Sequence, residues 1–322
     1  MHSEPLIWTD VDAANGVVLR STGEGLPLFL FPGMEGDGSS CLHLAQPAVE
    51  QAIAAGAPTI ELVVVDFSAE RHASLEALVG TCSDLVRGHL QRRGAESCLV
   101  WGQSFGNLLA AVVAPALGAR VDGCVLFSPF SALPAGRTRL ASLAMAVTPT
   151  FLYRAVIGRL GRLAFGPTGD GVDHGFFAGL RRMTAGQVRR RTGWLRSRKF
   201  ADRFARLEAP ARVWLGARDR LIDLEEQRRF FGELSRRRPG WSLHVLDSCG
   251  HVVLPSPIVT AVRRDLALWL VECAERAQGL RSVELRPPSR TAAPIRSAST
   301  GVSVAEGDVS RDDPSAPESP SP

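Results

Sequence analysis

The chain has 322 residues, of which 45% are hydrophobic and 22% charged, and its formal net charge at pH 7 is +4. This composition is typical of a globular protein and excludes a disordered, collagenous or coiled-coil chain. Residues 1–5 lack the basic segment and apolar run that begin a secretory signal. The six cysteines form no C-x-x-C pair, so we expect reduced, mostly buried thiols in a cytoplasmic protein and no metal site.

Apolar runs typical of strands alternate with helix-like segments along the chain. In chain order we expect strands at 6–9, 16–20, 27–31, 60–67, 98–101, 121–127, 212–215 and 243–246, and helices at 39–55, at 74–93 and from residue 105. Asn15-Gly16 is a strong signal for a hairpin between the first two strands. Most of these strands are apolar on both faces, which predicts an α/β fold: a mostly parallel, twisted sheet with helices on both faces. The uncharged stretch 97–119 is therefore interpreted as a buried strand, turn and helix, not as a membrane span.

Two segments depart from this alternation. About 80 residues separate the sixth and seventh strands, far more than an ordinary connection contains, and this arginine-rich, helix-compatible segment is interpreted as an inserted helical cap. Residues 287–322 contain 7 prolines, 8 serines and no aromatic residue, which predicts a disordered tail. The expected organisation is a first core part, a cap, a second core part and a tail, at 1–130, 131–208, 209–283 and 284–322.

The most specific motif is Gly102-x-Ser104-x-Gly106, which follows a predicted strand and precedes a predicted helix. In a nucleophile elbow of this kind, the serine lies on a strained turn above the sheet edge, and the two glycines let strand and helix pack closely. The helix that begins at Phe105 would direct free N–H groups at the reacting oxygen. A glycine-rich strand–helix turn without chemistry is the alternative, but the context favours a nucleophilic Ser104.

A nucleophilic serine needs a base. His251 directly follows a strand end in the segment Ser248-Cys249-Gly250-His251, where the glycine would let the loop bring the imidazole over the sheet, so it is the favoured base. The other histidines are expected in the first residues, within a strand, or solvated on helix and cap segments: His2, His244, His43, His72, His89 and His174.

The base in turn needs an acid that orients it. Asp219 follows the seventh predicted strand at its carboxyl end, where a loop would face the crevice of the sheet. Asp223 is an alternative that could instead cap a helix starting at Leu224. Asp247 is a second alternative, close to His251 in sequence. Asp219 is favoured on its placement.

The glycine-dense loop 31–38 closes the third predicted strand and is a candidate oxyanion hole. The expected donors are the backbone N–H groups of Met34 and Phe105, and one such donor is typically worth about 3 kcal/mol of barrier. A phosphate-binding role is disfavoured because no Gly-Lys-Ser/Thr follows the glycines.

These residues together resemble the α/β-hydrolase superfamily over about residues 5–280. The resemblance rests on the order Ser104, Asp219, His251, on the elbow, and on the Pro32-Gly33-Met34 loop. It implies a serine hydrolase with a cap domain that cleaves a carboxylic ester or thioester through an acyl-enzyme, without a cofactor. A serine nucleophile argues against the dehalogenase and epoxide-hydrolase chemistry that the family performs with aspartate. Pro32-Gly33 departs from the His-Gly that many members carry in this loop.

Two alternative functions stay open. The same acyl-enzyme could serve an acyltransferase or thioesterase acting on acyl-CoA or carrier-protein substrates. The fold could also be a catalytically idle binding protein. The expected partner is a small-molecule acyl ester or thioester, and nucleic acid is not expected, because no recognised binding module is present.

The predicted cap carries a basic block. Residues 181–206 contain ten basic groups and one acid, so the rest of the chain is mildly acidic. A solvated helical face is the plain interpretation. The alternative is steering of an anionic substrate or contact with an acidic membrane surface, for which the candidates are Arg181, Arg182, Arg189, Arg190 and Arg191. The apolar positions of 140–157 are expected to be cap core and, in part, to line the acyl site; an interfacial helix there is the alternative.

Overall fold

The computed structural model describes residues 7–133, 148–155, 157, 173–195, 200–251 and 256–279. The predicted disordered tail and parts of the predicted cap lie outside the described residues. All six cysteines are free and buried, as predicted. None of the described helices combines the length and the apolar character that a membrane span needs.

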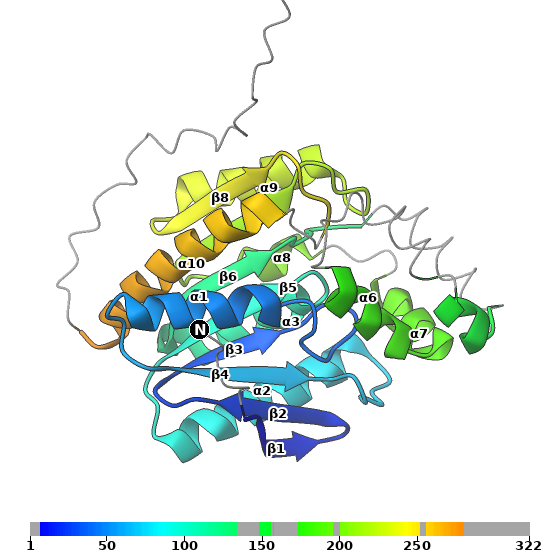
Figure 1. The fold of residues 1–322 in the computed structure, drawn as a ribbon, viewed down its shortest axis with the longest axis horizontal. Coiled ribbons are helices and arrows are strands. Elements are labelled where there is room, and N and C mark those ends of the chain that lie inside the picture. Colours follow the sequence, from blue (N-terminus) through cyan, green and yellow to red (C-terminus); the bar gives the residue numbers. More distant parts are fainter. Residues whose placement is uncertain are drawn as a thin grey trace, which may run out of the picture. The chain divides into compact units, whose positions relative to one another are not determined.

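Eight strands form one sheet in the order β1-β2-β4-β3-β5-β6-β7-β8 (Figure 1). From β1 to β8 their bounds are Thr9–Ala14, Val17–Thr22, Leu26–Phe31, Ile60–Asp66, Cys98–Gln103, Val121–Phe127, Ala211–Gly216 and Trp241–Leu246. β2 pairs antiparallel with β1 and β4, whereas the other neighbours are parallel. The predicted mostly parallel sheet is confirmed.

The amino-terminal hairpin is shifted from its predicted position. β1 begins at Thr9, not at residue 6, and the turn places Asn15 at φ 50° and Gly16 at φ 77°. This is the left-handed backbone that the Asn-Gly pair predicts for a hairpin turn. β1 pairs only with β2 among the described strands, and as an edge strand it is rich in polar residues. No apolar run therefore marked its extent.

Helices cover both faces of the sheet, which confirms the predicted α/β architecture. On one face, the apolar core involves α2, α3 and α9, and on the other it involves α1 and α10. Successive side chains of β4 point to opposite faces of the sheet. Val63 and Val65 therefore belong to the first core, and Leu62 and Val64 belong to the second. The helix bounds are Leu42–Ala54 (α1), Leu75–Arg93 (α2), Gly106–Leu117 (α3), Leu224–Arg237 (α9) and Ser256–Ala277 (α10), with a 3-10 turn at Gly118–Arg120.

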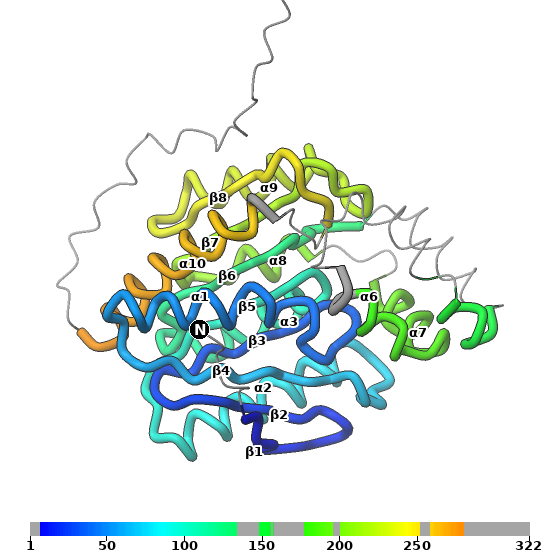
Figure 2. Tube along the Cα trace, viewed as in Figure 1, coloured from blue at the N-terminus to red at the C-terminus, as the bar shows by residue number. Residues whose placement is uncertain are grey.

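The described residues of the inserted segment include a helical stretch at 150–155 and the helices α6 (Asp173–Arg182), α7 (Ala185–Leu195) and α8 (Ala201–Phe204). α6 and α7 lie beside the carboxyl ends of β3 and β4 (Figure 2). Trp194 and Leu195 of α7, and Phe204 of α8, belong to the same apolar core as α2 and α3. The described end of the insert is therefore packed into the sheet domain.

Candidate active site

The turn between β5 and α3 carries Ser104. Its φ is 50°, in the left-handed region that serine rarely adopts. The Ser104 N–H donates to the carbonyl of Phe127 at the end of β6 (2.9 Å), so the turn is bound to the neighbouring strand. The side chain of Asn107, the second residue of α3, donates to the carbonyls of Ser104 (3.1 Å) and Phe127 (2.8 Å). This strained turn is therefore held from two sides.

The two glycines of the motif lie where a side chain would collide. A Cβ on Gly106 would be 2.0 Å from the carbonyl oxygen of Phe31 and 2.3 Å from that of Pro32. A Cβ on Gly102 would be 2.8 Å from the Cα of Asn107. Glycine at these two positions lets α3 approach both β5, the strand that precedes it, and the loop that follows β3.

Ser104, His251 and Asp219 form a continuous hydrogen-bonded relay. The Oγ of Ser104 lies 2.7 Å from Nε2 of His251, and Nδ1 of His251 lies 2.5 Å from Oδ2 of Asp219. All three residues are buried, with His251 0% and Ser104 8% exposed. The structure thus brings together the three residues that the sequence proposed as nucleophile, base and acid.

The alternative acids occupy other places. The second oxygen of Asp219, Oδ1, accepts the backbone N–H of Leu221 at 2.7 Å, which fixes the carboxylate toward His251. Asp223 caps α9 by accepting the N–H of Glu226 at 3.1 Å, and Asp247 is exposed. The geometry therefore favours Asp219 as the partner of His251.

The loop that carries His251 is bound to the ends of β6 and β7. The hydroxyl of Ser128, the residue after β6, donates to the carbonyl of His251. Ser128 itself has φ 49°, and its N–H donates to the carbonyl of Trp214 in β7 (2.8 Å). A Cβ on Gly216 would lie 2.1 Å from the carbonyl of Gly250. Sequence reasoning did not find Ser128, because its partner is a backbone atom 123 residues away.

Hydrogen bonds fix the loop after β3 around Met34. The Gly36 N–H donates to the carbonyl of Gly33 (3.1 Å), and the Phe67 N–H donates to the carbonyl of Gly36 (2.8 Å). A trans peptide unit is planar, so the N–H of Met34 points opposite to the Gly33 carbonyl, away from the loop's own bond. Phe105 precedes the first residue of α3, where backbone N–H groups lack intrahelical partners. The two expected oxyanion donors therefore lie near the same end of β3. Met34 is in the loop that follows this strand, and Phe105 precedes Gly106, which approaches the carbonyls of Phe31 and Pro32.

Glu35 is a buried carboxyl in this loop that sequence reasoning missed. Its side chain accepts hydrogen bonds from the hydroxyl of Ser40 and from the Ser40 N–H (3.3 Å). The Ser40 hydroxyl oxygen in turn accepts the Gly33 N–H (3.2 Å). Burial raises the pKa of Glu35 to about 7, opposed by the hydrogen bond from Ser40. Glu35 is therefore a buried acid whose side chain is linked, through the Ser40 hydroxyl, to the backbone of the candidate oxyanion loop.

Three of the arginines considered for anion steering are bonded to carboxylates of the sheet domain. Arg182 pairs with Asp37, and Arg190 pairs with Glu70 (2.8 Å). Arg191 is 0% exposed and also pairs with Glu70 (3.2 Å), so it is not placed to meet an anion arriving from solvent. Arg181 and Arg189 are exposed, and for these two the steering role stays a prediction.

Two histidines expected on solvated helix faces are buried and paired. His89 of α2 lies 3.1 Å from the carboxylate of Glu61, and His72 lies 2.8 Å from the Thr81 hydroxyl. His43 is partly buried, and burial lowers its pKa to about 4. The expectation of a solvated histidine was wrong at His89, which lies on the buried face of α2, and at His72, which lies in the loop before α2 and is buried there. His244 stacks on Trp214 with ring centres 4.3 Å apart.

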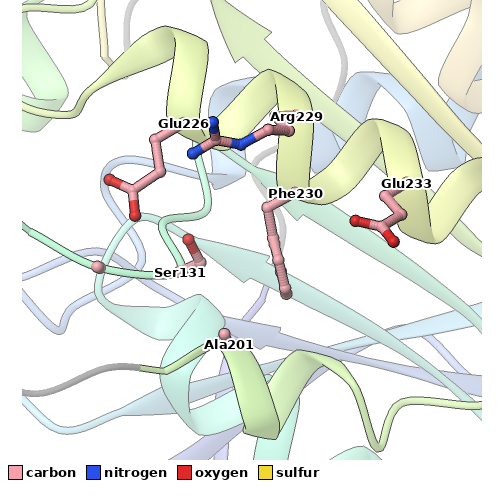
Figure 3. A pocket seen from close by; sticks show the side chains of 7 residues that line it. Ser131, Ala201, Glu226, Arg229, Phe230 and Glu233 are labelled. Atoms are coloured by element: carbon pink, nitrogen blue, oxygen red, sulfur yellow. The ribbon is translucent and has the colours of Figure 1, made fainter.

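One cavity lies away from the relay. It measures about 200 Å³ and is lined mainly by α9, with Ser131 and Ala201 on the opposite wall (Figure 3). Glu226, Arg229 and Glu233 supply its charges. None of its lining residues belongs to the relay or to the loop around Met34.

Comparison with known proteins agrees with this architecture. Residues 26–263 match the family described as "Alpha/beta hydrolase family". No curated protein was found to match the chain in sequence.

Solved structures with similar folds include two esterases and a bromoperoxidase. The esterase EaEST from Exiguobacterium antarcticum is 13% identical with a TM-score of 0.59, over 80% of this chain and 95% of that one. A bromoperoxidase from Bacillus anthracis is also 13% identical with a TM-score of 0.59, over 83% and 100%. The esterase RhEst1 from a Rhodococcus species is 21% identical with a TM-score of 0.57, over 81% and 98%. At these identities the likeness shows the fold alone.

Proposed function

Because the chain belongs to the alpha/beta hydrolase family, we propose that it is a serine hydrolase that cleaves a carboxylic ester or thioester of a small molecule. The observation that carries the proposal is the relay from Ser104 through His251 to Asp219, with distances of 2.7 and 2.5 Å. A nucleophile, a base and an orienting acid in hydrogen-bond contact are the recurring arrangement of acyl-transfer catalysis.

In the first step of the proposed reaction, the Oγ of Ser104 attacks the acyl carbon, and Nε2 of His251 takes the hydroxyl proton. Asp219 holds the imidazole through Nδ1 and stabilises its positive charge. The negative charge that develops on the acyl oxygen is met by the N–H groups of Met34 and Phe105. Collapse of the tetrahedral intermediate breaks the bond to the alcohol or thiol, which leaves with the proton from His251.

In the second step, His251 removes a proton from water, and the resulting hydroxide attacks the acyl-enzyme. The second tetrahedral intermediate collapses to the free acid, and His251 returns the proton to Ser104. The same acyl-enzyme transfers its acyl group to an alcohol where that acceptor binds in place of water. An acyltransferase or a thioesterase for acyl-CoA or carrier-protein substrates is therefore a variant of this chemistry.

Two tests address the proposal and the identity of the substrate. A fluorophosphonate probe reacts with an activated serine whatever the natural substrate is, so we expect wild type to be labelled and Ser104→Ala to be unlabelled. Folded wild type that is not labelled would favour a catalytically idle binding protein and overturn the proposal. Turnover of p-nitrophenyl esters of increasing chain length, beside acyl-CoA thioesters and with added alcohols, then separates ester, thioester and transfer activities.

A further inference from the structure

We propose that Arg191, in the insert, is a positioning residue for the oxyanion hole: its guanidinium fixes the peptide that follows the Met34 N–H. This inference rests on the proposed function, because it assigns a role within the same site. Arg191 lies on α7, 157 residues from Met34 in sequence, and its side chain reaches across the carboxyl ends of β3 and β4.

The guanidinium of Arg191 donates to three acceptors in two loops of the sheet domain, one after β3 and one after β4. One Nη donates to the carbonyl of Met34, and the other donates to the carbonyl of Phe67 after β4 (2.6 Å). Nε donates to the carboxylate of Glu70 (3.2 Å). The planar guanidinium, with its fixed fork of donors, suits this arrangement in a way that the single ammonium of lysine does not.

The surroundings explain why a charged group is stable in this buried place. Glu70 is 1% exposed and offers the opposite charge that a buried cation needs. Burial alone would raise the pKa of Glu70, but the hydrogen bond from Arg190 and the charge of Arg191 together bring it below its usual value. The guanidinium carbon also lies 5.0 Å from the centre of the Phe67 ring, within the range of a cation–π contact. Glu70 therefore stays ionised and keeps Arg191 in place at neutral pH.

Both peptide planes next to Met34 are consequently fixed. The plane before it is set by the bond from the Gly36 N–H to the Gly33 carbonyl (3.1 Å). The plane after it is set by the bond from Arg191 to the Met34 carbonyl. The Met34 N–H lies in the first plane, which the bond that closes the turn 33–36 holds. The second plane is the central peptide of this turn, so its release would let the turn rotate about the soft torsions of Met34 and Glu35 and would weaken the hold on the Met34 donor.

The docking of α7 does not depend on this arginine alone. Trp194, one turn further along, packs its ring 6.4 Å from that of Phe105, beside the nucleophile, and its Nε1 donates to the carbonyl of Ala73 (3.2 Å). Leu195 is buried in the same core. Removal of the guanidinium is therefore expected to leave α7 docked while it frees the Met34 peptide.

The test compares Arg191→Met and Arg191→Lys in the full chain. Titration with a fluorophosphonate counts the active sites, and kcat is then expressed per titrated site on a p-nitrophenyl ester. Since one oxyanion donor is worth about 10²–10³ in kcat, we expect Arg191→Met to lower kcat by about 10- to 100-fold, with KM within about twofold. Arg191→Lys, which keeps the charge beside Glu70, should recover part of this loss.

A control arginine separates positioning from general docking. Arg203 of α8 also joins the insert to the sheet domain, through Glu76 of α2 (3.2 Å), and Arg203→Met should leave kcat per titrated site within about twofold. A kcat per site that is unchanged in both Arg191 variants contradicts the inference, whatever their thermal stability. If Arg191→Met does not fold, Arg191→Lys alone tests the inference by the same measurement. The inference then requires a lower kcat per titrated site with an unchanged KM in Arg191→Lys. Absence of labelling in wild type would instead contradict the proposed function.

Discussion

The two sides of the candidate site are built in different ways. The relay side is held within the sheet domain, where Ser104, Asp219 and His251 follow three strands. The backbone N–H of Leu221 fixes the acid, and the side-chain hydroxyl of Ser128 binds the carbonyl of the base. The proposed oxyanion side is the loop around Met34. The peptide before Met34 is held by a hydrogen bond within the loop, and the peptide after it is held by Arg191 from the insert. Under the proposed mechanism, proton transfer would depend on the sheet domain, whereas stabilisation of the oxyanion would also depend on how the insert docks.

The largest effect is expected on the relay side, from Asp219→Asn. Asparagine keeps the shape but removes the charge and favours the wrong imidazole tautomer, which lowers kcat by about 10⁴-fold in serine hydrolases. The measurement is kcat per titrated site. Asp247→Asn, exposed near the same histidine, is the matched control and should retain kcat; equal losses in the two variants would contradict the assignment of Asp219.

The contact between the two sides is tested by Gly106→Ala. The added Cβ would lie 2.0 Å from the Phe31 carbonyl oxygen, so either the elbow or the end of β3 must move. We expect a loss of more than about 2 kcal/mol in unfolding free energy, as for other overpacked sites, and a fall in kcat of at least about 100-fold. Chemical denaturation and steady-state kinetics measure the two.

Gly193→Ala provides the control for that substitution. Gly193 lies in α7, and a Cβ there would meet no atom within 4 Å, so alanine should stabilise the helix by up to about 1 kcal/mol. A stable, fully active Gly106→Ala protein would show that the close approach of α3 to β3 is not needed.

On the oxyanion side, Glu35→Gln should change how stability depends on pH. The pKa of Glu35 is raised from 4.5 to about 7 in the folded state, so the folded protein holds a proton that the unfolded chain releases between these values. Stability from this group is therefore lost as pH rises from about 4.5 to 7, by up to about 3 kcal/mol. Glutamine does not ionise, so the stability of the variant relative to wild type should increase as pH rises over this range.

Denaturation midpoints at pH 5 and pH 8 test this prediction. The difference between Glu35→Gln and wild type should grow from the lower to the higher pH. Glu225→Gln, on the exposed face of α9, should show the same difference from wild type at both. A pH-independent difference for Glu35→Gln would mean that the carboxyl keeps its charge in the folded protein.

The smallest effect is expected from Ser128→Ala, which removes the hydroxyl that binds the His251 carbonyl. One lost hydrogen bond of about 1 kcal/mol corresponds to a fall in kcat of about fivefold to tenfold, with KM unchanged. Ser242→Ala removes a hydroxyl that contacts His244 instead (3.1 Å) and should retain kcat. If Ser128→Ala also retains kcat, the histidine loop is held well enough by its other contacts.

Sequence patterns located the buried strands and the relay because each carries a local signature. Val121–Phe127 is a mostly apolar run with clear ends, and β6 has these bounds. The relay residues follow strand ends, and the parallel sheet brings those ends to one edge. β1 was misplaced because an edge strand does not need an apolar run.

The residues that hold the site in place lack such signatures. Ser128 and Arg191 bind backbone carbonyls 123 and 157 residues away, and a carbonyl leaves no trace in the sequence. A basic block is also ambiguous by itself: Arg191 is buried beside Glu70, while Arg189 of the same run is exposed. Only the packing of α7 distinguishes the two.

The most direct measurement is to locate the adduct formed by a fluorophosphonate, through mass spectrometry of peptides from the inactivated protein. We expect one adduct per chain, on the peptide that contains Ser104, with its formation slowed in Asp219→Asn. An adduct on a different residue, or folded protein that gains no adduct, would contradict the assignment of Ser104 as the nucleophile.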